Sequence, residues 1–207
     1  MKIYQIVEST ENGNNAGTKA VQDAATIAQR CGFEPIYVRM CTTRDGSLAK
    51  AERQVGYWHD WRAAYQAIES NSLVLLQNPF HHKQLTREKT LQKLRDKKNV
   101  KFISLVHDVE ELRRFRYNDY YKHEFEVMLE LADMLIVHND RMAEFFKQRG
   151  VPEEKMVVLK IFDYLQDSVP ATTPIFEKKI VVAGNLDTKK CAYIKELSKL
   201  QGVEVQL

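Results

Sequence analysis

Short apolar runs alternate with segments of helical periodicity along most of the chain, and this alternation constrains the fold more than any other feature of the sequence. Each run has the length of a strand, and each intervening segment is long enough for a crossover helix. Strands that are joined by helices pair in parallel, so the sequence predicts an α/β fold. The expected strands are 3–7, 34–39, 72–77, 100–106, 134–138, 156–161 and 179–183.

Two of these runs, 73–76 and 134–137, are apolar without interruption. An uninterrupted apolar strand is typical of a sheet with helices on both faces, so the sequence predicts three layers, with the sheet between two layers of helices. The segments between the strands supply the helices, because apolar residues recur with the helical period over 121–132 and 142–146. Trp61, Tyr65 and Ile68 share one face of an earlier helix and are expected to pack inward.

Two prolines, Pro170 and Pro174, stand among small polar residues and indicate a linker between domains. We therefore expect a first domain at 1–166, a linker at 167–177 and the beginning of a second domain at 178–207. Two strands and a helix cannot bury a core of their own, so this last region should belong to a larger domain or pack on the first.

Composition argues against several classes of protein. The formal net charge is only +3 over 207 residues, which is too weak for a nucleic-acid footprint. The chain shows neither an apolar run long enough to span a membrane nor a secretory signal, and its three cysteines lack metal-ligand spacing. The sequence therefore predicts a cytoplasmic protein without a nucleic-acid partner.

The loop 8–19 follows the first expected strand, where open α/β sheets place ligands. Gly13 and Gly17 would let the backbone approach a ligand, and the free amides at the following helix start would attract an anion or sugar hydroxyls. The alternative is a flexible turn without a ligand. The glycine spacing fits neither the dinucleotide-binding fingerprint nor the phosphate-binding P-loop, which argues against both classes.

His107 and Asp108 directly follow the strand 100–106, and either side chain could accept a proton from a hydroxyl nucleophile. Asp108 could equally be only a helix cap, and His107 only a loop residue. Arg113 lies in a run of cations and aromatics that could hold a phosphate or form a solvated helix start. Gly184 begins a turn that could seat a diphosphate, although ordinary strand-to-helix turns look the same. No Asp-x-Asp pair offers ligands for a metal.

Taken in order, these features resemble bacterial GT-B glycosyltransferases near the β-1,6-galactofuranosyltransferase and glucosyltransferase 3 group. The segments that carry the resemblance are 4–7, 14–20, 104–113, 132–139, 150–151 and 161–165. The resemblance implies two facing Rossmann-like domains with doubly wound parallel sheets. The first would bind the acceptor and the second, only begun in this chain, the nucleotide-sugar.

The resemblance also implies a reaction and roles for particular residues. A hexosyltransferase of this type would transfer a sugar from a nucleotide-sugar, with UDP expected, to a hydroxyl of a glycan or glycosylated carrier, without metal or other cofactor. His107 or Asp108 would act as the base. The implied acceptor-binding residues are Asn14, Asn15, Gly17, Thr18 and Arg113, and the implied diphosphate-binding residues are Gly184, Asn185 and Leu186.

Alternatives stay open at this point. The chain alone is expected to be inactive, so it could instead be a non-catalytic module that binds an acceptor or a partner. A lipid-linked acceptor would bring the protein into peripheral contact with the inner membrane face, and a homo-oligomer is compatible with the resemblance. A nucleotide-cofactor enzyme such as an epimerase would need the glycine fingerprint that the sequence lacks.

Overall fold

A computed structural model describes residues 1–9, 16–39, 46–80, 83–109, 118–160, 165–166, 178–182, 194–197 and 199–206. The chain forms two compact units, Met1–Leu165 and Gln166–Leu207. The segment 167–177, expected to be a linker, lies outside the described residues.

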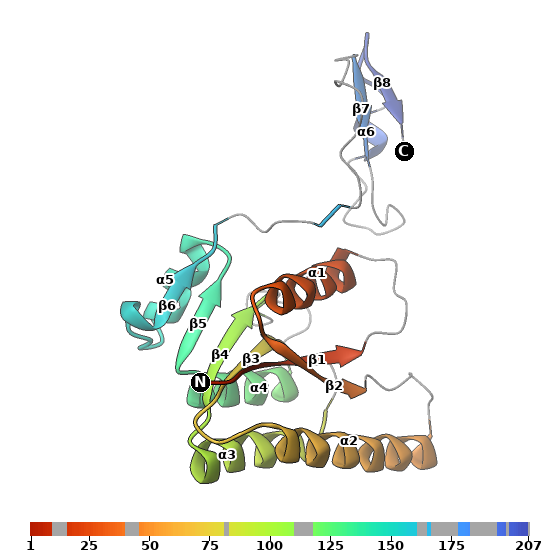
Figure 1. The fold of residues 1–207 in the computed structure, drawn as a ribbon. Coiled ribbons are helices and arrows are strands. Elements are labelled where there is room, and N and C mark those ends of the chain that lie inside the picture. Colours follow the sequence, from red (N-terminus) through yellow and green to blue (C-terminus); the bar gives the residue numbers. More distant parts are fainter. Residues whose placement is uncertain are drawn as a thin grey trace. The chain divides into compact units, whose positions relative to one another are not determined.

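The first unit is built on a six-stranded sheet with the order β2-β1-β3-β4-β5-β6, in which every pair of neighbours is parallel (Figure 1). This confirms the predicted α/β fold with a Rossmann-like parallel sheet. The strands are β1 (Ile3–Ser9), β2 (Glu34–Arg39), β3 (Leu73–Asn78), β4 (Lys101–Val106), β5 (Met134–Val137) and β6 (Met156–Val158).

Helices cover both faces of this sheet, as the uninterrupted apolar strands predict. On one face α1 packs Ala24 and Ala28 against Leu75 and Leu105. On the other face α2, α3 and α4 share one core with the first four strands, and α5 packs beside α4. The helices are α1 (Ala16–Arg30), α2 (Ser47–Ala67), α3 (Arg87–Lys98), α4 (Asp119–Leu131) and α5 (Asp140–Lys147).

The larger core lies between the sheet and the helices α2, α3 and α4. Trp61 and Ile68 are fully buried in it, as their shared helical face predicts, together with Phe102 of β4 and Leu94 of α3. A second cluster joins α5 to β5 through Phe146, which stacks on Phe125 of α4. Burial of these large side chains supplies most of the favourable free energy of folding.

Local signals set several element boundaries. The carboxamide of Asn139 accepts a hydrogen bond from the Met142 amide at 2.9 Å and thereby caps α5. Asn118 caps α4 in the same way. Strand β6 ends at Val158 instead of the expected 161, because Lys160 has a φ of 67°, which lies in the left-handed region and breaks an extended strand.

The second unit contains a two-stranded parallel sheet of β7 (Lys179–Val181) and β8 (Glu204–Gln206). Within its described residues, one helix, α6 (Ile194–Leu197), lies in the connection between these strands. Two strands and a helix were expected here, and the first strand is shorter than the expected 179–183. No helix in the described parts of the chain is long and apolar enough to cross a membrane.

Two leucines offer a matched test of this core. Leu94→Ala should lower the free energy of unfolding by about 2–5 kcal/mol, because Leu94 is 0% exposed and its removal leaves a cavity. Leu48→Ala should change it by no more than about 0.5 kcal/mol, because Leu48 is 80% exposed. Urea unfolding followed by circular dichroism measures both, and equal losses would contradict this packing.

Candidate functional site

The carboxyl ends of β1 and β3 meet where the strand order changes direction. Their ladder pairs only three residues, from Ile3↔Leu73 to Gln5↔Leu75, although β1 continues to Ser9 and β3 to Asn78. The two strands are therefore not joined at their carboxyl ends. In open α/β sheets ligands bind at such a switch point. We refer to this place as the β1–β3 crevice.

On the α1 face of the sheet, Gln77 connects His107 to the first helix. Its Nε2 donates to the Val21 carbonyl oxygen of α1 at 3.2 Å, and its Oε1 lies 2.7 Å from Nε2 of His107. Because Oε1 can only accept, the imidazole must carry its proton on Nε2.

A second imidazole stands beside the first. The ring centroids of His107 and His138, which follow β4 and β5, are 5.7 Å apart. Burial lowers the pKa of His138, and the nearby Asp108 carboxylate opposes this shift. His138 is therefore neutral near pH 7 and adds no positive charge to its neighbour. The structure thus brings both proposed proton acceptors, His107 and Asp108, to the carboxyl edge of the sheet.

The start of α1 lies at the same edge, since α1 follows β1. Gly17 and Thr18 occupy its first turn. Lys19, in the next position, forms an ion pair with Asp23 at 2.8 Å and donates to the Leu165 carbonyl oxygen at 2.9 Å. Asp23 also accepts from the Leu165 amide at 3.1 Å. These contacts fasten the end of the first unit to α1.

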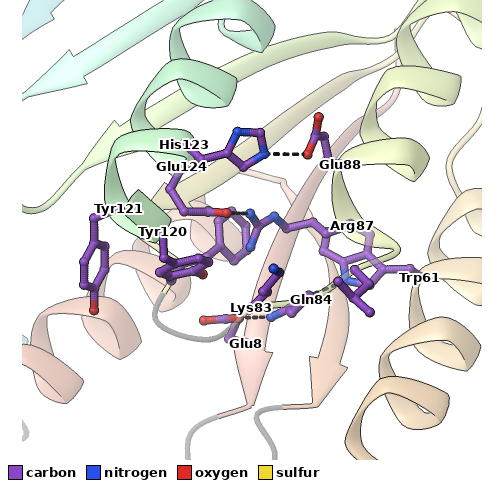
Figure 2. Close-up of polar contacts among 12 residues, drawn as sticks. Glu8, Trp61, Lys83, Gln84, Arg87, Glu88, Tyr120, Tyr121, His123 and Glu124 are labelled. Carbon is purple, nitrogen blue, oxygen red and sulfur yellow. Dashed lines mark hydrogen bonds and ion pairs between the residues drawn. The ribbon is translucent and has the colours of Figure 1, made fainter. Parts of the chain in front are cut away.

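The opposite face of the same edge carries a cluster of polar side chains, which we call the Glu8 cluster (Figure 2). Its members are Glu8, Gln84, Arg87, Tyr120 and Glu124.

Glu8 lies near the end of β1, and its Oε1 accepts a hydrogen bond from Nε2 of Gln84. Oε1 of Gln84 in turn accepts from the buried indole of Trp61 at 2.6 Å. The indole can only donate, so it fixes which end of the Gln84 amide faces Glu8. The carboxylate is therefore held by a partner whose own orientation is fixed.

Arg87 forms the centre of the cluster. Its Nη2 is paired with Oε1 of Glu124 from α4, and both side chains are buried. The guanidinium also lies over the Phe80 ring, 4.3 Å from its centroid. Tyr120 donates its hydroxyl to the Phe80 carbonyl oxygen at 2.9 Å, and burial raises the pKa of that hydroxyl. Two carboxylates thus share one cation.

Burial with too little neighbouring positive charge raises the pKa of both carboxyl groups, Glu8 and Glu124. Burial raises the pKa of Glu8 to about 7, while Arg87 and the Gln84 hydrogen bond oppose the shift and Glu124 adds to it. Burial likewise raises the pKa of Glu124, against the attraction of Arg87. Glu8 therefore exchanges its proton near neutral pH, which is a property of acid, base and switch groups in active sites.

The structure describes some of the residues predicted for the site. His107, Asp108, Gly17 and Thr18 are described, whereas six others lie outside the described residues, namely Asn14, Asn15, Arg113, Gly184, Asn185 and Leu186. The functional roles of all ten stay predictions.

Sequence reasoning missed the Glu8 cluster. The apolar stripe expected over 121–132 did not include Glu124, which is buried. The available signal was a charged residue, Glu8, at the end of an otherwise apolar strand. Gln84 and Arg87 gave no signal, because they are separated from Glu8 by more than 70 residues and meet it only after folding.

Comparison with known proteins identifies the family of the domain that contains this edge of the sheet. The family model for the glucosyltransferase 3-like N-terminal domain matches residues 3–161. The chain therefore belongs to the glucosyltransferase 3-like family, which confirms the resemblance. No curated protein matches the chain.

Among solved structures that match is HepE of Anabaena in complex with UDP and glucose. It is 11% identical to this chain with a TM-score of 0.43, and the match covers 75% of this chain and 43% of that one. The chain thus spans less than half the length of that protein.

The pKa of Glu8 gives a test of the cluster by stability. Its ordinary pKa of 4.5 rises to about 7 on folding, so the proton stabilises the folded state below pH 4.5 and this stabilisation is lost as the pH rises to about 7. Glu8→Gln keeps an oxygen that accepts from Gln84 and removes the charge. Above about pH 8 it should raise the free energy of unfolding, on the order of 2 kcal/mol.

Urea unfolding across this pH range measures the effect, with the gain growing between pH 4.5 and about 7. The matched control is Glu52→Gln on the exposed surface of α2, which should change stability by no more than about 0.5 kcal/mol. A gain for Glu8→Gln that is the same at every pH would show that Glu8 does not titrate as described.

Proposed function

We propose that the complete protein containing this chain is a glycosyltransferase of the GT-B type, in which Met1–Leu165 forms the acceptor-binding side of the catalytic cleft. It transfers a sugar from a nucleotide-sugar, with UDP as the expected nucleotide, to a hydroxyl of a glycan or glycosylated carrier. The observation that carries this proposal is the match of the glucosyltransferase 3-like domain over residues 3–161.

The chemistry of the carboxyl edge supports this proposal. Sugar transfer needs a group that accepts the proton of the acceptor hydroxyl, and this edge presents an imidazole, a carboxylate and the start of a helix. The bond between Nε2 of His107 and Gln77 fixes the orientation of the imidazole. A base that is oriented by a second side chain is the arrangement that proton transfer requires.

In the proposed reaction the acceptor oxygen attacks the anomeric carbon of the donor sugar. The new carbon–oxygen bond forms as the bond from that carbon to the diphosphate breaks, and the nucleoside diphosphate leaves with the electron pair. The hydroxyl proton passes to the imidazole of His107 or to the carboxylate of Asp108. Backbone amides near Gly184, Asn185 and Leu186 are proposed to stabilise the departing diphosphate.

The remaining expectations form part of the same proposal. No metal or other cofactor is assigned, because the sequence has no Asp-x-Asp pair to hold a nucleotide-bound cation. The enzyme is proposed to work in the cytoplasm, with a lipid-linked acceptor as the reason for any contact with the membrane. Asn14, Asn15, Gly17, Thr18 and Arg113 are proposed to position the acceptor.

Separate His107→Ala and Asp108→Asn variants of the complete protein test the assignment of the base. Loss of the proton acceptor should lower kcat about 100- to 10,000-fold, because general-base catalysis contributes a factor of this size. Release of UDP from UDP-glucose, UDP-galactose or UDP-N-acetylglucosamine, with p-nitrophenyl glycosides as acceptors, measures turnover.

The matched control is His59→Ala, which removes an exposed imidazole from α2 and should leave kcat unchanged. Circular dichroism establishes that each variant is folded. Wild-type turnover in both the His107 and the Asp108 variants would reject the assignment of the base, and absence of transfer by the wild-type protein would reject the function.

A further inference from the structure

We propose that Glu8, Asn78 and Arg87 form a binding subsite for sugar hydroxyl groups on the α2–α4 face of the β1–β3 crevice. The arrangement of donors and acceptor calls for a ligand with hydroxyl groups. That this ligand is the acceptor sugar rests on the proposed function. This subsite is separate from His107 and Gln77, which lie on the α1 face of the same edge.

Glu8 supplies a hydrogen-bond acceptor to this subsite. Gln84 occupies its Oε1, and within the part of the chain that the structure describes Oε2 has no hydrogen-bond partner. The carboxylate cannot turn freely toward other partners, because the chain from Trp61 through Gln84 holds it in place. Oε2 is thus a preorganised acceptor at the end of β1.

Two buried nitrogen atoms supply the donors. Arg87 is 3% exposed and Asn78 is 6% exposed, and among the described residues neither Nη1 of Arg87 nor Nδ2 of Asn78 has a hydrogen-bond partner of good geometry, although the guanidinium also interacts with the Tyr120 hydroxyl. Buried donors in folded proteins are almost always paired, so two such donors at one edge point to a ligand that pairs them. Hydroxyl oxygens can accept from both.

The register and the helix packing place these three residues at the same edge of the sheet. Three residues beyond the last pair of the β1–β3 ladder, Gln5↔Leu75, the positions are Glu8 on β1 and Asn78 on β3. Arg87 begins α3, and Figure 2 shows its guanidinium between Glu124 and the pair formed by Glu8 and Gln84. The donors and the acceptor therefore lie at the same end of the crevice.

The charges select a neutral, hydroxyl-bearing ligand. A phosphate or carboxylate would be repelled by Glu8 and Glu124, which outnumber the buried cation Arg87, whereas the Lys83 ammonium beside Glu8 in Figure 2 belongs to an exposed side chain. A metal ion would be repelled by the guanidinium. A sugar hydroxyl donates to Oε2 and accepts from Nδ2 or Nη1, so it can satisfy both kinds of group at once.

Ligand binding should then depend on the charge of Glu8. The ionised carboxylate accepts a stronger hydrogen bond from a hydroxyl than the protonated form does. Because burial raises the pKa of Glu8 to about 7, affinity should fall as the pH is lowered through that value. Between about pH 8 and about pH 6 the expected loss is up to about tenfold.

Glycoside binding to the 207-residue chain tests the subsite, with the methyl glycosides of glucose, galactose and N-acetylglucosamine as probes. Side-chain NMR signals of Asn78 and of carboxyl-labelled Glu8 report binding directly, at pH values above and below about 7. At least one glycoside should shift both signals, with the affinity falling at the lower pH. Glu8→Gln should bind with little dependence on pH, and Glu52→Gln should behave as the wild type.

Asn78→Leu provides a second variant, since it removes a donor without changing any charge. It should weaken binding at every pH while the pH dependence stays. The subsite is overturned if no glycoside shifts the signals, or if Glu8→Gln keeps the wild-type pH dependence. In the complete protein, sugar transfer with an unchanged acceptor KM in Glu8→Gln would overturn the subsite alone, whereas absence of any transfer by the wild-type protein would overturn the proposed function.

Discussion

Right-handed connections between parallel strands determine where everything else in the first unit lies. The chain steps from β1 to β2 in one direction and from β3 to β6 in the other, so α1 falls on one face and α2, α3, α4 and α5 fall on the opposite face. The same reversal leaves the carboxyl ends of β1 and β3 without a shared ladder. The position of the β1–β3 crevice thus follows from the backbone topology alone and not from any side chain.

The two faces of this crevice carry different chemistry. On the α1 face, Gln77 fixes the tautomer of His107, and the neighbouring His138 is kept neutral by burial. On the other face, Glu8 and Glu124 compete for the single cation of Arg87. One face therefore carries an imidazole whose orientation is fixed by Gln77, and the other carries an acid whose charge changes near neutral pH.

The Glu8 cluster shows how a folded core can carry electrostatic strain at the edge of a sheet. Three carbon-rich neighbours, Trp61, Phe80 and Tyr120, exclude water around Arg87 and its partners. Exclusion of water strengthens the ion pair with Glu124 and at the same time makes the charge of Glu8 costly. A purely structural core would gain stability by replacing Glu8 with a neutral residue. Retaining an acid there is consistent with a role in binding.

The sequence by itself determined the order of strands and helices, their parallel pairing and the coverage of both faces, because these follow from hydrophobic periodicity along the chain. It also placed His107 and Asp108 at the carboxyl edge of the sheet, since residues directly after a strand must lie there. Only the tertiary structure decided that Glu8, Gln84, Arg87 and Glu124 meet, which joins β1, α3, α4 and the turn before α3. Such contacts depend on how the helices pack against one face, and pKa values depend on the resulting burial, so neither is encoded in any local pattern of residues.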